Sequence, residues 1–190
     1  MVILGFIAEG DTEKRVLTSE NFRDLLKKLD LPFLGEVENA GGVSNLRKDK
    51  IKSLIQIQKD RGADKVLILT DSDGKCITSA KKEIDPTGEN IVIVAVQMIE
   101  AWFLADTTAM SNLLKGKYFC EAPEAIPNPF ELIKAERKER LGSGVGDKRT
   151  LGQKMHYSGF SLEAAATHPN CPSAKYFLDK LTALSLPKAT

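Results

Sequence analysis

The chain has 190 residues, of which 42% are hydrophobic and 28% are charged, and its formal net charge is +1. This length suits one domain with a real core, and the composition excludes a disordered chain. The small net charge provides no global field for nucleic acid, although a local patch or a bound cation would serve a phosphate as well. Three widely spaced cysteines without a CxxC pair indicate free thiols in a reducing cytoplasm, and no apolar run is long enough for a membrane span.

The first predicted strand is an apolar run over residues 2–8 that ends in Glu9 and Gly10. Gly10 permits a tight turn into a helix whose apolar positions, through Leu29, fall on one face. Glu13 lies in the first turn of this helix. We therefore expect Glu9 and Glu13 to face the same crevice at the carboxyl edge of a sheet, although Glu13 would also suit the helix N-terminus for electrostatic reasons alone.

Two further segments precede the third strand. Residues 31–39 predict a short strand, and a Gly-Gly pair separates it from a helix over residues 44–61 that stops at Gly62. One face of this helix is formed by Ile51, Leu54, Ile55 and Gln58. Such a face predicts that the helix packs against a sheet.

The third strand begins at Lys65 and ends in two carboxylates, Asp71 and Asp73. Its unbroken apolar run is typical of a strand buried on both faces in a parallel sheet. The intervening Ser72 would let both carboxylates point to one side of an extended segment, at the edge where open α/β sheets bind ligands. Because adjacent carboxylates repel unless a cation or proton lies between them, we expect a Mg²⁺ or Mn²⁺ site. A simple Asp-Gly turn is the structural alternative.

A short helix over residues 78–84 and a fourth strand over residues 91–96 follow, and the chain then enters residues 99–106. A helix here carries Glu100 near its start and Asp106 near its end. Both reach the same edge of the sheet only if the helix is short or bent, and each also has a plain structural role as a helix terminus. The β-α-β-α-β-α-β order predicts an α/β fold, with a mostly parallel four-stranded sheet and helices on both faces.

The pattern after Asp106 is helical and looser, with strong helix signals over residues 129–141 and 173–184. We predict an α/β core over residues 1–106 and a C-terminal helical cap over residues 107–190, packed together as a single structural domain because no long linker separates them.

A glycine-rich hinge precedes three basic residues, Lys148, Arg149 and Lys154. They are candidates for a nucleic-acid phosphate clamp, although clusters of this kind are usually a solvated face. Trp102 is better interpreted as a core residue than as a platform for base stacking.

Three acidic motifs follow the first, third and fourth predicted strands: Glu9-Gly-Asp-Thr-Glu13, Asp71-Ser-Asp73 and residues 99–106. Together with Gly41-Gly42 and the stretch 171–181, they resemble the DUF4276 family, a group of small bacterial and archaeal proteins with a Toprim-like catalytic core. The first two motifs are shared with the Toprim domains of topoisomerases, primases and OLD (overcoming lysogenisation defect) nucleases. The resemblance implies a Toprim-like fold and Mg²⁺-dependent phosphodiester chemistry on DNA or RNA.

Position by position, the resemblance assigns the Toprim glutamate, a metal ligand and general base or acid, to Glu9. It assigns the DxD metal ligands to Asp71 and Asp73, and the second acid of OLD-like nucleases to Glu13. Its extension to Glu100 and Asp106 matches the later acids of those nucleases. Proteins like this family often belong to phage-defence or mobile-element loci beside an ATPase, so an ATPase partner is implied, and no ATPase domain lies within these 190 residues.

Other functions stay open on sequence grounds. Residues 71–75 resemble the DxDGT motif of haloacid dehalogenase phosphatases, but they follow the third strand and Lys75 replaces the threonine. Receiver domains place an acid pair after strand one and a lone acid after strand three, the reverse of this chain. A non-catalytic or partner-dependent subunit is a further alternative. The sequence does not distinguish a DNA substrate from an RNA substrate, or a one-metal site from a two-metal site. It also leaves open whether the chain forms a homo-oligomer.

Overall fold

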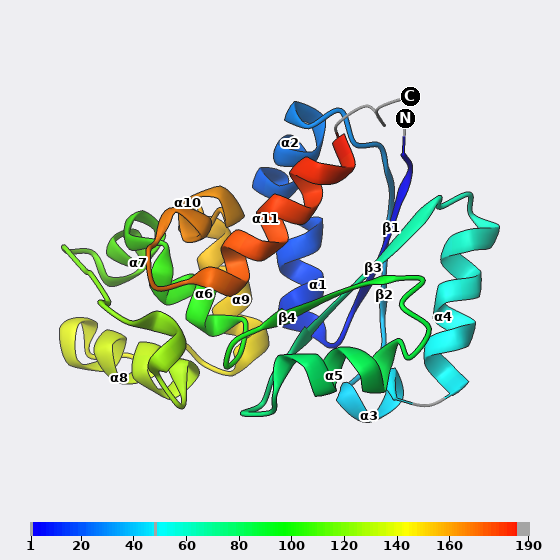
Figure 1. Ribbon diagram of the computed structural model, residues 1–190. Coiled ribbons are helices and arrows are strands. Elements are labelled where there is room, and N and C mark those ends of the chain that lie inside the picture. Colours follow the sequence, from blue (N-terminus) through cyan, green and yellow to red (C-terminus); the bar gives the residue numbers. More distant parts are fainter. Residues whose placement is uncertain (1, 48, 186–190) are drawn as a thin grey trace.

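A computed structural model describes residues 2–47 and 49–185 of the chain. Its four strands form one parallel sheet in the order β2-β1-β3-β4 (Figure 1). The strands are β1 (Leu4–Ala8), β2 (Phe33–Asn39), β3 (Lys65–Asp71) and β4 (Ile91–Ala95). This confirms the predicted α/β fold with a four-stranded sheet, and every strand pair in it is parallel.

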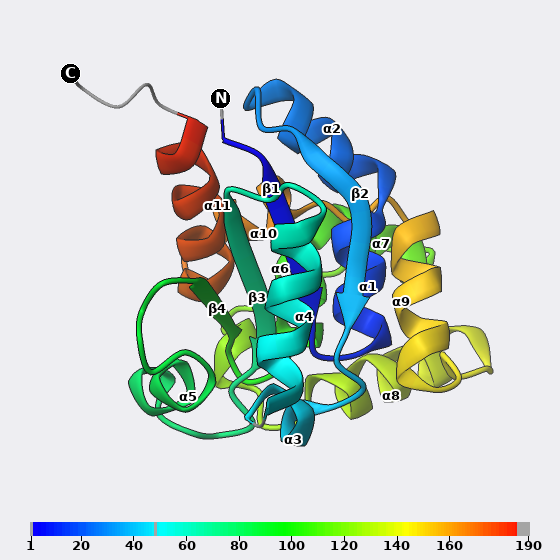
Figure 2. The same ribbon diagram turned by 90° about the vertical axis from the view of Figure 1, so that its right-hand side faces the viewer.

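Helices cover both faces of the sheet, as the continuous apolar strands predicted (Figures 1 and 2). Alternate residues such as Phe6 and Leu69 belong to the core formed with α1, α2, α6 and α11. The residues between them, such as Ile7 and Ile68, pack with α4 and α5 on the opposite face. The six helices are α1 (Asp11–Thr18), α2 (Glu20–Lys28), α4 (Asp49–Asp60), α5 (Ile77–Ile84), α6 (Glu100–Ala105) and α11 (Pro172–Ser185).

The strand order places a topological switch point between the carboxyl ends of β1 and β3. From β1 the chain passes through α1 and α2 to β2 on one side, and from β2 it returns through α4 to β3 on the other side of β1. In Figure 2 the strands run from top to bottom, so their carboxyl ends meet at the lower edge of the sheet. At such a switch point the two connections diverge, and open α/β sheets bind their ligands there.

Two helices that we predicted as continuous are each interrupted. The first is broken at Ser19, whose side chain accepts a hydrogen bond from Phe22 N and so begins α2 as a new helix. The second consists of α3 (Val43–Leu46) and α4, and residue 48 between them lies outside the described residues. The apolar stripe continues across the first break, so periodicity alone did not reveal it.

The C-terminal part adds helices that pack on the same core. Phe177 of α11 lies 5.7 Å from Phe22 and 5.9 Å from Trp102, measured between ring centroids, and all three side chains are buried. Trp102 is therefore a core residue, as predicted. The added elements are α7 (Thr107–Leu114), the 3-10 turn η1 (Pro123–Ala125), α8 (Pro129–Leu141), α9 (Lys148–Tyr157) and α10 (Leu162–Thr167). The division at residue 106 stays a prediction.

The sequence patterns did not predict α9 and α10. Both begin at a side-chain cap, Asp147 for α9 and Ser161 for α10. Within residues 2–47 and 49–185, no helix is both long enough and apolar enough to cross a membrane.

Candidate functional site

Acidic side chains from two strand ends and two helices gather at the carboxyl edge of the sheet. Glu9 follows β1, Asp71 ends β3, Glu13 lies in the first turn of α1, and Glu100 opens α6 behind β4. Asp71 and Ala95, the last residues of β3 and β4, are paired with each other, so the two strands end side by side at this edge of the sheet. The predicted convergence of these elements is therefore present in the fold.

Backbone amides fix one oxygen of each of three acids. Asp71 N donates to Oε2 of Glu9 at 3.2 Å, Gly10 N donates to Oε2 of Glu13 at 3.0 Å, and Ile99 N donates to Oδ1 of Asp71 at 2.8 Å. The other oxygens of Glu9 and Asp71 accept no hydrogen bond from the residues that the structure describes. In each of these two carboxylates, hydrogen bonds hold one oxygen in place and leave the other oxygen able to bind a ligand.

Glu100 is the most unusual member of this acidic group. Its side chain is fully buried, and neither Oε1 nor Oε2 has a hydrogen-bond partner among the described residues. The nearest opposite charge is Nζ of Lys148, 3.8 Å from Oε1. A buried carboxylate costs several kcal/mol unless a proton or a cation neutralises it. The Glu100 carboxylate is therefore chemically suited to bind a cation in this part of the site.

Burial and mutual repulsion raise the pKa values of three of these acids, Glu13, Asp71 and Glu100. Burial raises the pKa of Glu13 to about 7, and the charges of Glu9 and Glu100 add to the rise. Burial also raises the pKa of Asp71 well above its usual value, with further contributions from Glu13, Glu100 and Glu9. The pKa of Glu100 is raised by burial as well, against the opposing charge of Lys148. A divalent cation would replace protons on these acids.

Asp73 is placed differently from the extended arrangement that we expected. Asp73 and Gly74 both have positive φ, 47° and 75°, and Lys75 N donates to Ser72 O at 2.9 Å. This is the pattern of a type I′ turn, in which Asp and Gly are favoured central residues. Asp73 therefore does not alternate with Asp71 along a strand. Its exposed side chain lines a hollow of about 270 Å³ with Gln97 and Met98, and its charge adds to the raised pKa of Glu100.

Asp106 has a structural role that the metal-ligand prediction did not foresee. Its Oδ1 accepts a hydrogen bond from Ala109 N at 2.9 Å and caps α7, and its Oδ2 accepts one from Ser161 N at 3.0 Å. Burial raises its pKa, but none of the other acids contributes to that rise. Because α6 ends at Ala105 and Asp106 starts the next helix, the structure does not bring this carboxylate to the acidic group.

One of the predicted basic residues reaches the acidic group. Besides its approach to Glu100, Nζ of Lys148 lies 3.5 Å from Sδ of Met98, and the Lys148 carbonyl accepts a hydrogen bond from Thr12 Oγ1 at 3.4 Å. Arg149 is more exposed and lies 4.0 Å from Asp11. Lys154 lies further along α9, and it forms no ion pair with the described residues.

Sequence reasoning missed one polar residue of the site. Thr70 is fully buried at the end of β3, and its hydroxyl donates a short hydrogen bond to Oε2 of Glu9. The only signal was its position, since it is the one polar residue in the apolar run before Asp71. Thr70 ties the first and third strands together at the acidic edge.

The donor chemistry of the site suits a hard divalent cation. Its ligating atoms are carboxylate oxygens, which Mg²⁺ and Mn²⁺ prefer, and Glu100 presents two buried oxygens without partners. Within the described part of the chain, no three Asp, Glu, His or Cys side chains are already arranged around one point as a metal site. The acids thus fit a cation in their chemistry, and binding one requires their side chains to move towards a common point.

Comparison with solved structures identifies one fold relative. The chain is similar to the C-terminal region of the Burkholderia pseudomallei OLD protein, with a TM-score of 0.50 and 14% sequence identity, over 98% of this chain and 100% of that one. The likeness confirms the predicted OLD-related, Toprim-like fold, and at this identity it speaks for the fold alone. No family model matches the chain, and no curated protein does.

Proposed function

We propose that the chain is a Toprim-type nuclease that cleaves phosphodiester bonds of DNA or RNA with Mg²⁺ or Mn²⁺. The observation that carries this proposal is the buried Glu100 carboxylate, which lacks any hydrogen-bond partner in the described structure and adjoins other acids on the sheet edge. A buried, unneutralised carboxylate beside like charges is expected where a cation binds. The Toprim-like fold agrees with a nuclease, and membership of the DUF4276 family is part of the proposal.

Five acids are the proposed metal ligands: Glu9, Glu13, Asp71, Asp73 and Glu100. Asp106 is left out, because backbone amides occupy both of its oxygens. When bound, the metal would activate a water molecule and stabilise the leaving oxygen of an in-line displacement. The protein holds Glu9 and Asp71 each by one oxygen, so that the other faces the ligand without a large cost in side-chain entropy.

Two residues have proposed roles besides metal binding. Glu9 has the proposed role of general base or acid at the acidic edge. The Thr70 hydroxyl orients the Glu9 carboxylate by a hydrogen bond. Lys148 is exposed to solvent and carries the positive charge that approaches the acids, so it is suited to contact a substrate phosphate. Arg149 and Lys154, also on α9, are proposed as further contacts to substrate phosphates. The proposal also includes an ATPase partner protein and a role in phage defence.

The test combines metal binding with cleavage. Calorimetry with Mn²⁺ measures the affinity of the wild type and of Asp71→Asn, and incubation with plasmid, single-stranded DNA and RNA measures cleavage. We expect Asp71→Asn to weaken Mn²⁺ binding at least about tenfold and to abolish cleavage, because it removes one charged ligand. Asp24→Asn, at a half-exposed acid of α2 outside the acidic group, is the matched control and should change neither.

The outcomes separate the two parts of the proposal. Absence of divalent-cation binding by the wild type would refute the metal site. Metal binding without cleavage of any of the three nucleic acids, by contrast, would favour a partner-dependent subunit over an independent nuclease.

A further inference from the structure

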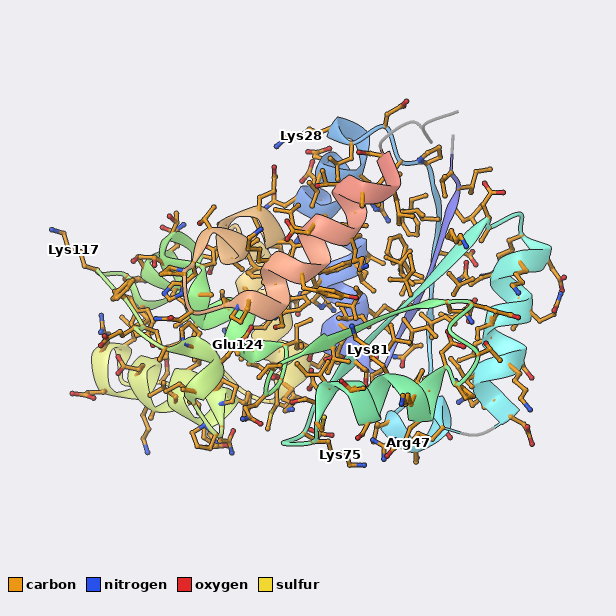
Figure 3. All side chains as sticks on the ribbon, in the orientation of Figure 1. Lys28, Arg47, Lys75, Lys81, Lys117 and Glu124 are labelled. Carbon is orange, nitrogen blue, oxygen red and sulfur yellow. The ribbon has the colours of Figure 1, made fainter. Side chains whose placement is uncertain are left out.

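A groove of about 420 Å³ runs along the outer edge of β4, between α5 and α11. Because β4 pairs with β3 alone, its other edge faces this groove. The lining includes Lys81 from α5, Asn90 and Ile91 at the start of β4, and Tyr176 and Lys180 from α11. Figure 3 shows Lys81 on the side of α5 that is turned towards β4 and α11. Three separate elements thus place polar side chains around one hollow.

Two lysines surround a single tyrosine in this groove. Nζ of Lys81 lies 4.0 Å from the centroid of the Tyr176 ring, and Nζ of Lys180 lies 5.2 Å from it. Both lysines are half-buried, and Tyr176 is 37% exposed. Burial acts to raise the pKa of Tyr176, but the two ammonium groups outweigh it and hold that pKa below its usual value. The two lysines therefore give the surroundings of the Tyr176 ring a positive charge.

Two lysines, Lys81 and Lys180, face a single acid, Asp85, in the lining of this groove, which leaves it an excess of positive charge. Lys81 and Lys180 form no ion pair with any residue in 2–47 or 49–185. The acids nearby are already engaged: Asp85 accepts from Thr87 Oγ1 at 2.8 Å and from Asn90 N at 2.7 Å, and Asp179 pairs with Lys175 at 2.8 Å. Two ammonium groups held around one ring repel each other, and a confined hollow concentrates their field.

We propose that Lys81, Tyr176 and Lys180 form a binding site for a phosphate group. The two ammonium groups can donate charge-assisted hydrogen bonds, and the phenol hydroxyl can donate a neutral one. Together these donors suit the several oxygens of a phosphate group. The phosphate belongs either to a nucleic-acid backbone or to a small free phosphate, and both sources share this chemistry. The site lies at the start of β4, four residues before Ala95 and thus about 13 Å from the acidic edge.

Binding is measured on the full chain carrying Asp71→Asn, in EDTA, so that neither metal nor cleavage at the acidic edge contributes. Calorimetry follows inorganic phosphate, and fluorescence anisotropy follows a labelled single-stranded oligonucleotide. The variants in this background are Lys81→Gln, Lys180→Gln and Tyr176→Phe. Lys82→Gln is the matched control, because it removes the same charge from an exposed position one residue away on α5.

We expect Lys81→Gln and Lys180→Gln each to weaken phosphate binding about fivefold to tenfold, with a smaller loss for Tyr176→Phe and less than a twofold change for Lys82→Gln. A parallel loss of oligonucleotide affinity would identify a backbone phosphate as the ligand, and a loss confined to inorganic phosphate would identify a free phosphate. The proposal is overturned if neither probe binds, or if Lys82→Gln weakens binding as much as Lys81→Gln. Since no metal or cleavage is involved, failure of the nuclease proposal leaves this result unaffected.

Discussion

Glu13 is neutral at a pH at which an exposed glutamate is charged. Its pKa in the folded chain is about 7, against an ordinary value of 4.5, so the folded state binds more protons than the unfolded state between these values. The stability that this proton provides is complete below about pH 4.5 and is lost as the pH rises through 7. Asp71 and Glu100, whose pKa values are also raised, act in the same direction.

From this we predict that the metal-free protein becomes less stable between pH 5 and pH 8. In Glu13→Gln the side chain is neutral at every pH and still accepts a bond from Gly10 N, so this variant should match the wild type at pH 5 and exceed its free energy of unfolding by about 2 to 3 kcal/mol at pH 8. Urea unfolding in EDTA at both pH values measures the difference.

Glu20→Gln is the control for this experiment, because Glu20 is an exposed acid in the first turn of α2. It should leave the pH dependence unchanged. A wild-type stability that rises between pH 5 and pH 8 would contradict the assignment of a buried proton to the acidic group. Mn²⁺ should reduce the loss of stability at pH 8, because the cation replaces the protons.

At the level of single elements, the packing of α4 on β1 depends on a glycine. A Cβ atom on Gly5 would lie 2.9 Å from the Cβ atoms of Gln58 and Ala63 and 2.8 Å from Oε1 of Gln58. Gln58 is fully buried, and its Nε2 donates to Phe6 O at 3.1 Å and to Glu36 O at 3.3 Å, where the register between β1 and β2 shifts. The helix is thus held close to the strand by a buried amide.

We predict that Gly5→Ala destabilises the fold by about 1 to 3 kcal/mol, because the added methyl group overpacks this contact. Gly116→Ala is the matched control, since its Cβ would meet its nearest neighbours at 4.0 Å. Urea unfolding followed by the fluorescence of Trp102, the only tryptophan, measures both variants. Equal stability of the two variants would show that α4 moves away from β1 at little cost.

Most of the elements were predictable because their signals are local. The apolar runs of β1, β3 and β4 are long enough to identify buried strands, and their order predicts a parallel sheet. Parallel strands bring their carboxyl ends to one edge, so the meeting of Glu9 and Asp71 followed from sequence. The one-face pattern of α4 likewise predicted Gln58 on the buried side, although its bonds to two strands did not follow from periodicity.

The features that the sequence did not predict depend on contacts between residues that are far apart in the chain. Asp106 is a helix terminus, which the sequence offered as the alternative to a metal ligand, but its bond to Ser161 joins residues 55 positions apart and had no local signal. The approach of Lys148 to Glu100 depends on how α9 packs on α1, which sequence patterns do not specify. Asp73 was misplaced because we extended the strand through a turn that the Asp-Gly pair already indicated.

Across the whole molecule, one apolar core joins the sheet to the C-terminal helices, and a buried serine adds a polar connection. Ser173, at the start of α11, accepts hydrogen bonds from Trp102 Nε1 at 2.7 Å and from Val96 N at 3.3 Å, and its hydroxyl donates to Oε1 of Glu124 at 2.6 Å. These bonds connect α11 with α6, with the end of β4 and with η1. We therefore expect the chain to unfold as one cooperative unit.

The last prediction tests that unity. Ser173→Ala leaves the buried indole N–H of Trp102 without its acceptor, so it should lower the free energy of unfolding by about 1 to 3 kcal/mol while unfolding stays a single transition. Ser185→Ala, at a partly exposed serine of the same helix whose hydroxyl donates to Thr182 O, should change stability by less than about 0.5 kcal/mol. Circular dichroism and tryptophan fluorescence report on different parts of the chain, because Trp102 lies where the sheet meets α11. Two separate transitions by these probes would contradict a single domain and would favour a helical cap that melts independently of the α/β core.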